Sequence, residues 1–121
     1  MGLSNWIIEF YTKGTNNRCP TDDLLSSLTK QDVYSIRRAI GQLSEHGNKL
    51  VDGKHAKFIG NEIYELRVRT NQGHYRFFFF FFDGTKIIIT HGYSKKTSAL
   101  DPSEIRKAKE YRKDYLTRNK R

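Results

Sequence analysis

Six consecutive phenylalanines, Phe77 to Phe82, constrain the fold of this chain more than any other feature. Successive side chains of a β-strand point to opposite faces, so a strand through this run carries large aromatic rings on both sides. Such a strand is typical of the centre of a sheet that is covered on each face. The run is far too short to cross a membrane. The sequence therefore predicts a sheet with a central, doubly covered strand.

Further strands are predicted around this run. Residues 63–69 alternate so that Tyr64, Leu66 and Val68 face one way and Glu65, Arg67 and Arg69 face the other. A turn over 70–73 leads into the strand at 75–82. The Asp83-Gly84 pair, a strong hairpin signal, leads into a strand over 86–93. These three strands form an antiparallel meander, and another strand is predicted over 6–11.

Two helices are predicted between the first strand and the meander. Thr21 is expected to cap a short helix, and Thr29 is expected to cap a longer one with Asp32 at the capping-box position. Gly47 is the expected stop of the longer helix. Its buried stripe is predicted from spacings of three and four residues: Val33, Ile36, Ile40 and Leu43.

A last helix is predicted from Asp101 as cap, Pro102 as its first residue and Glu104 at the capping-box position. Its apolar side carries Ile105, Ala108, Tyr111 or Arg112, and Tyr115; its opposite side carries Arg106, Lys107, Lys109, Lys113 and Arg118. Residues 118–121 are expected to fray. The order β-α-α-β-β-β-α describes one α+β domain over residues 1–121, in which helices pack on a small twisted antiparallel sheet.

The charge of the chain points to a polyanionic partner. The 22 Lys and Arg residues exceed the 13 Asp and Glu residues, which gives a formal net charge of +9, and most of the excess follows residue 60. Nucleic acid is the favoured partner, an anionic membrane surface is a weaker alternative, and a merely solubilising surface is the third.

The cysteines and histidines of the chain argue against a disulfide-linked or metal-binding protein. Cys19 is the only cysteine, so the chain can form neither an intramolecular disulfide nor a cysteine-based metal site. His46, His55 and His74 have no partner at metal-ligand spacing, so no metal and no cofactor are expected. With no signal-peptide pattern and no membrane segment, a cytoplasmic location is predicted.

The residues that could carry chemistry lie on the meander. Arg67 and Arg69 share a strand face, and Arg76 begins the neighbouring strand, so three guanidinium groups can converge on one sheet face. Arginine has a planar fork that suits phosphate oxygens, so Arg67 and Arg76 are the predicted charge clamp for a phosphate under attack. His91, Tyr93, Lys95 and Lys96 end the next strand and could supply the acid or base at the rim of that face. A cationic pocket is expected to depress the pKa of a lysine or of Tyr93.

Each candidate also has a structural interpretation. Arg67 could simply pair with Glu65 or Asp83, and Tyr93 could be a packing residue. Alternation with Ile87 and Ile89 places His91 toward the core, where a hydrogen-bonded histidine is at least as common as a catalytic one. The two lysines could be solvated loop residues.

The ordered set of segments resembles the RelE/HigB-like toxins, particularly the phage-derived HigB-type branch. The resemblance rests on Ile63-Tyr64-Glu65-Leu66-Arg67, Tyr75-Arg76-Phe77, Thr90-His91-Gly92-Tyr93-Ser94-Lys95-Lys96-Thr97 and the helix that begins at Pro102. It covers nearly the whole chain. The family's strand arginines fall on Arg67 and Arg76, its basic strand-end loop on Lys95 and Lys96, and its aromatic on Tyr93; where some members have paired lysines, this chain has Glu65 and Arg67.

The resemblance implies a toxin with a microbial-ribonuclease-like fold that cleaves mRNA, usually on the ribosome, and is silenced by a cognate antitoxin. The antitoxin is expected to be a helix-turn-helix protein, and operator DNA would be contacted only through it. The reaction needs no metal, because a ribose 2′-hydroxyl attacks the adjacent phosphate. Arg69, Arg106, Lys107, Lys109 and Lys113 are the predicted RNA-binding residues. The alternative is a non-catalytic RNA- or DNA-binding protein, such as a phage regulator, that uses the same basic surface.

Overall fold

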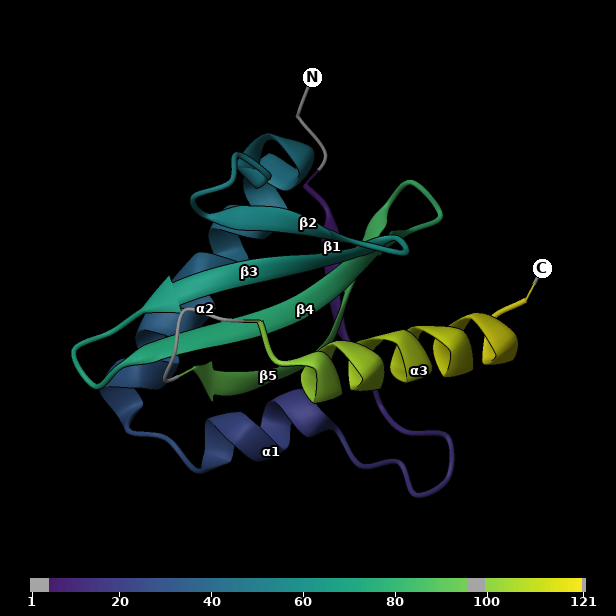
Figure 1. Ribbon diagram of the computed structural model, residues 1–121, viewed down its shortest axis with the longest axis horizontal. Helices are drawn as coiled ribbons and strands as arrows, with labels where there is room; N and C mark the ends of the chain where they lie inside the picture. Colours follow the sequence, from purple (N-terminus) through teal and green to yellow (C-terminus); the bar gives the residue numbers. More distant parts are fainter. Residues whose placement is uncertain (1–4, 96–99, 121) are drawn as a thin grey trace.

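A five-stranded sheet in the order β1-β5-β4-β3-β2 runs through the middle of the molecule in the computed structural model, which describes residues 5–95 and 100–120 (Figure 1). The strands are β1 (Ile7–Phe10), β2 (Ala56–Gly60), β3 (Ile63–Arg69), β4 (His74–Phe82) and β5 (Lys86–Lys95). The helices are α1 (Pro20–Ser26), α2 (Lys30–His46), the short 3-10 helix η1 (Gly47–Leu50) and α3 (Pro102–Arg118). The predicted α+β class, with helices packed on a small sheet, is confirmed.

The phenylalanine run forms the centre of this sheet, as predicted. β4 is the middle strand, and its rings enter two separate cores. Phe77, Phe79 and Phe81 pack on the side of α1 and α2, whereas Phe78, Phe80 and Phe82 pack on the side of α3. Figure 1 shows the same three layers, with α3 on one face of the sheet and α1 and α2 on the other. Both faces of β4 are therefore covered.

The buried stripe of α2 is also confirmed. Ile36, Ile40 and Leu43 are buried against the sheet, and the backbone N–H of Asp32 donates to the Thr29 hydroxyl at 3.2 Å. The helix ends at Gly47, whose φ of +52° lies in the region that favours glycine. A side chain there would also collide with the indole of Trp6, so the stop signal doubles as a packing position.

Two features of the sheet differ from the prediction. β2 is an additional strand, which pairs antiparallel with β3, and its residues show no alternation of buried and exposed side chains. β1 pairs parallel with β5, so the sheet is mixed rather than wholly antiparallel. The chain between β1 and β5 contains helices and three further strands, and a connection of that length allows the two strands to run in the same direction.

Three local predictions are wrong. α1 is capped by Cys19, whose Sγ accepts from the backbone N–H of Asp22 at 3.4 Å, while Thr21 lies buried inside the helix. Pro20 at the first helical position was the signal for this start. Asp101 does cap α3, but the Glu104 carboxylate contacts His91 instead of closing a capping box. α3 continues to Arg118, which is bonded to Asp114, so fraying cannot begin before Asn119, and Arg121 lies outside the described residues.

A β-bulge interrupts the pairing of β4 with β5. Phe79 pairs with Ile89, but the next pair is Phe78 with His91, so Thr90 is the extra residue. The Thr90 hydroxyl donates to the carbonyl of Phe78 at 3.3 Å. One inserted residue moves every later side chain of β5 to the other face of the sheet. His91 is buried, as alternation suggested, but on the face opposite to Ile87 and Ile89.

Candidate functional site

The candidate residues lie side by side on the face of the sheet that also carries α3. The strand register places them in rows across β3, β4 and β5: Glu65-Phe78-His91, Arg67-Arg76-Tyr93 and Arg69-His74-Lys95. The bulge at Thr90 brings the β5 members onto this face. The sequence prediction of a shared face is confirmed for Arg67, Arg69, Arg76, His91, Tyr93 and Lys95. The interpretation of Lys95 as a solvated loop residue is wrong, because Lys95 belongs to β5 and is buried. Lys96 lies outside the described residues.

Glu65 holds the two central arginines together. Its side chain is buried, and its Oε1 accepts from the Nε of Arg67 at 3.3 Å and lies 3.4 Å from the Nε of Arg76. The ion pair between Arg67 and Glu65, expected as one interpretation, is therefore present. This ion pair does not neutralise the arginines completely, because two guanidinium groups share one carboxylate. The cluster retains a net charge of +1.

The two arginines differ in their remaining contacts. The Nη1 of Arg67 donates to the carbonyl of Gly53 at 2.8 Å, so this side chain is fixed to the segment before β2. Within residues 5–95 and 100–120, no hydrogen bond is described for the terminal nitrogens of Arg76. Both arginines are only partly exposed, with 31% and 15% of their side chains accessible. This arrangement suits a guanidinium pair that grips an anion at the surface.

Tyr93 completes the central row. Its ring stacks on Phe78 with centroids 5.9 Å apart, and its hydroxyl is buried without a hydrogen-bond partner among the described residues. Burial, reinforced by Glu65 and other nearby carboxylates, raises the pKa of Tyr93. The sequence-based expectation of a depressed tyrosine pKa is wrong, because burial and these carboxylates outweigh Arg76. Tyr93 is therefore protonated at neutral pH and can donate a hydrogen bond.

Unpaired polar atoms gather at this cluster. Among the described residues, the buried side-chain atoms without a hydrogen-bond partner include Glu65 Oε2, Arg76 Nε and the Tyr93 hydroxyl. Buried polar groups in proteins normally have partners, and those that do not call for an explanation. A bound oxyanion would supply acceptors for the arginine and tyrosine donors. The arginine and tyrosine donors are thus available to an oxyanion, whereas Glu65 Oε2 is an acceptor and would need a donor instead.

His91 is engaged in the core beside this cluster. Its Nε2 lies 2.9 Å from Glu104 Oε1, its Nδ1 lies 3.2 Å from the Thr90 hydroxyl, and only 4% of the residue is exposed. Burial lowers the pKa of His91 and outweighs the nearby Glu104 carboxylate. With both ring nitrogens occupied, the imidazole is suited to fixing α3 on β5. Its assignment as an acid or base stays a prediction.

The outer row contains a histidine that sequence reasoning did not assign. His74 is exposed, and it lies two residues before Arg76 on the same face, between Arg69 and Lys95. Histidine is the commonest general acid or base among protein side chains. The sequence could have indicated this position, because a residue directly after the turn at 70–73 pairs with Arg69 directly before it.

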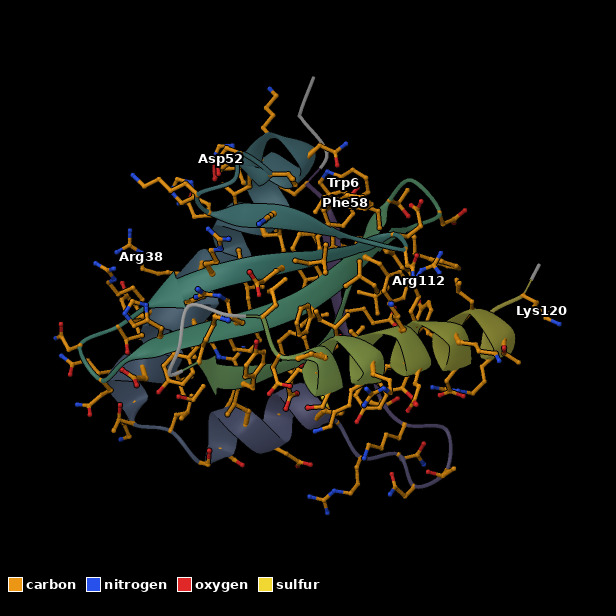
Figure 2. All side chains as sticks on the ribbon, viewed as in Figure 1. Trp6, Arg38, Asp52, Phe58, Arg112 and Lys120 are labelled. Atoms are coloured by element: carbon orange, nitrogen blue, oxygen red, sulfur yellow. The ribbon has the colours of Figure 1, made fainter. Side chains whose placement is uncertain are left out.

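Four of the five predicted RNA-binding residues lie on α3, away from its buried side, and the fifth, Arg69, lies on β3 in the outer row. Arg106, Lys107, Lys109 and Lys113 are exposed, and Lys107 pairs with Glu104 at 3.5 Å. Arg112 instead turns inward, with its guanidinium 5.6 Å from the centre of the Phe80 ring, and Figure 2 shows it between α3 and the sheet. These four exposed cations form a basic strip on α3, which packs on the face of the sheet that carries the three rows.

A family model supplies the relationship of this chain to known proteins. The model described as "Phage derived protein Gp49-like (DUF891)" matches residues 23–113, more than half of the chain. The chain belongs to the Gp49-like family. This Gp49-like family is associated with RelE/HigB-like toxins, so the phage-derived, toxin-like part of the expectation is supported. No curated protein matches the chain.

The match spans α2 and the whole meander, and it therefore includes every residue of the three rows. Among the described residues of this Gp49-like protein, no group of three or more His, Cys, Asp or Glu side chains could hold a metal ion. No helix in the same residues is long and apolar enough to span a bilayer.

Proposed function

We propose that this Gp49-like protein is the toxin of a toxin–antitoxin system and acts as an endoribonuclease that cleaves mRNA on the ribosome. The observation that carries the proposal is the Arg67-Arg76-Tyr93 row, in which Glu65 orients two guanidinium groups beside an unpaired, protonated phenol. A phosphate in the transition state of RNA cleavage gains negative charge. Donors that are already oriented toward such a charge stabilise it without further reorganisation.

The chemistry of this reaction assigns roles to the row. The ribose 2′-oxygen attacks the adjacent phosphorus, the bond to the 5′-oxygen breaks, and a 2′,3′-cyclic phosphate and a 5′-hydroxyl result. Arg67 and Arg76 would contact the non-bridging oxygens, and Tyr93 would donate to the phosphate or the leaving oxygen. The base would be the exposed His74 or the buried Lys95 of the outer row, or else Lys96, which follows Lys95 in the sequence. His91 would act as a positioning residue.

A substrate bound to the ribosome fits this set of catalytic groups. The ribosome can hold mRNA in a geometry ready for attack, so the toxin would add mainly charge and proton transfer. The basic strip of α3 would then dock on ribosomal RNA, with a steep dependence on salt. A cognate helix-turn-helix antitoxin would silence the protein and would provide any contact with operator DNA.

A non-catalytic nucleic-acid-binding protein is the second candidate, and one observation favours it. His91, the histidine nearest to the central row on β5, is buried with both ring nitrogens occupied. A binding protein would need the arginines but no available acid or base. Cleavage itself separates the two candidates.

The test is a cell-free translation reaction with purified protein, in which mRNA ends are mapped by primer extension beside a sample of free mRNA. The expected result is new ends on translated message with the native protein, and their loss with Arg67→Ala/Arg76→Ala. Lys30→Ala/Arg37→Ala, which removes two exposed cations of α2, is the control for charge and should still cleave. Intact message with the native protein would refute the enzyme and leave the binding protein.

A further inference from the structure

A groove that is lined in part by Arg67 opens on the side of the sheet that carries α2. It has a volume of about 570 Å³ and lies between α2 and the segment 49–55 that follows it. We call it the α2 groove; the lining residues used below are Tyr34, Arg38, Lys49, Asp52, His55 and Arg67. Arg67 belongs to both the groove and the central row, because its Nη1 bonds to Gly53 while its Nε bonds to Glu65. The groove is therefore continuous with the proposed site at Arg67.

The α2 groove carries positive charges that are free to contact a ligand. Arg38 and Lys49 are exposed, and no ion pair is described for either within residues 5–95 and 100–120. The acidic residue of the lining, Asp52, is already engaged: it accepts from the backbone N–H of Lys54 and of His55, and its second oxygen lies 2.8 Å from His55 Nδ1. Figure 2 shows Arg38 on α2 and Asp52 in the segment after η1, at the same end of the molecule.

The α2 groove also carries an exposed aromatic ring. Tyr34, on the first turns of α2, is 64% exposed, which is unusual for a large aromatic residue in a chain whose other tyrosines are mostly packed. Cationic side chains interleaved with an exposed ring are the recognition elements of single-stranded nucleic acid: the cations follow the backbone, and the ring stacks on a base.

We propose that the α2 groove binds the single-stranded RNA segment that flanks the phosphate held by Arg67 and Arg76. Arg38 and Lys49 contact its phosphates, and Tyr34 stacks on one of its bases. The proposal rests on the proposed function, since it extends the substrate beyond the reacting bond. An acidic peptide would satisfy the cations equally well, but it would make no use of the ring. The continuity with Arg67 favours the substrate strand.

The test measures binding by fluorescence anisotropy with a labelled single-stranded 2′-O-methyl RNA of ten nucleotides. The methyl group blocks the attacking hydroxyl, so the probe reports binding without cleavage. Arg38→Ala/Lys49→Ala should lower the slope of log affinity against log salt by about 1.4, because each phosphate contact contributes about 0.7 for single strands. Lys30→Ala/Arg37→Ala, which removes the same two charges from exposed positions outside the groove, should leave the slope unchanged.

The aromatic ring is tested separately. Tyr34→Ala should weaken binding about tenfold, while Tyr34→Phe, which keeps the stacking surface, should bind like the native protein. Equal effects of the two double variants, or no loss with Tyr34→Ala, would overturn the proposal. Tighter binding of an oligoglutamate peptide than of the RNA would overturn it in favour of a protein partner.

These outcomes are separate from those of the cleavage assay. Cleavage that depends on Arg76, together with unchanged binding in the groove variants, would refute the α2 groove alone. The predicted binding losses without any cleavage would refute the enzyme and leave the groove as an RNA-binding site.

Discussion

Replacement of Glu65 by Gln tests how the arginine pair is held. Gln has nearly the same shape and keeps an oxygen that can accept from Arg67, so the change removes the charge and little else. Loss of one partner of a fully buried ion pair costs about 3–5 kcal/mol, and exposed pairs contribute about 0–1 kcal/mol. Glu65 is 1% exposed, but its two arginines are 31% and 15% exposed and are screened by water. We therefore expect a loss of about 2 kcal/mol.

Thermal unfolding followed by circular dichroism at pH 7 measures this loss. For a domain of this size, 1 kcal/mol corresponds to a shift in Tm of about 4 °C, so Glu65→Gln should lower Tm by about 8 °C. Glu110→Gln makes the same chemical change at an exposed position of α3 and should stay within about 0.5 kcal/mol of the native protein.

Glu65→Gln should act on RNA binding in the opposite direction. The charge of the cluster rises from +1 to +2, so the variant should bind single-stranded 2′-O-methyl RNA more tightly at low salt although it is less stable. An unchanged Tm would show that the carboxylate does not hold the arginines. A lower affinity would show that it positions them for the phosphate more than it competes with the phosphate.

Two further predictions concern β5. Gly92→Ala would place a Cβ atom 2.3 Å from the Phe77 ring, so we expect it to destabilise the protein by about 1–3 kcal/mol in urea unfolding. Gly41→Ala, in open space on α2, should instead stabilise it by up to about 1 kcal/mol, and equal effects of the two changes would contradict the packing of Phe77 on Gly92. Burial lowers the pKa of His91 in the folded protein, so the unfolded chain binds its proton more readily, and stability should fall as the pH drops below about 6.5. His91→Gln should flatten this slope in Tm measured from pH 7.5 to 5; a slope equal to that of the native protein would assign it to other groups.

Much of the candidate site could be predicted because antiparallel strands joined by a short turn have a predictable register. The turn at 70–73 pairs Arg69 with His74 and, two residues on, Arg67 with Arg76. Glu65 was recognised as a neighbour of Arg67, but its role as the shared partner of both arginines requires distances across two strands. The α2 groove was not predicted, because its lining comes from α2, from the segment 49–55 and from β3, and only the fold brings these together.

The sequence by itself determined the layers of this protein. Six phenylalanines in succession require a strand with cover on both faces, and the spacing of apolar residues in α2 and α3 supplies helices with one buried side each. These are local properties, since each depends on residues within a few positions of one another.

Only the tertiary structure decided which face the end of β5 presents. Strict alternation from Ile87 and Ile89 would have placed His91, Tyr93 and Lys95 on the α2 side of the sheet, away from the arginines. The bulge at Thr90 reverses this, and it forms where β5 pairs with Phe78 and Phe79. A bulge is a property of two paired strands and leaves no period in either one. The row of Arg67, Arg76 and Tyr93 exists because of that one unpaired residue.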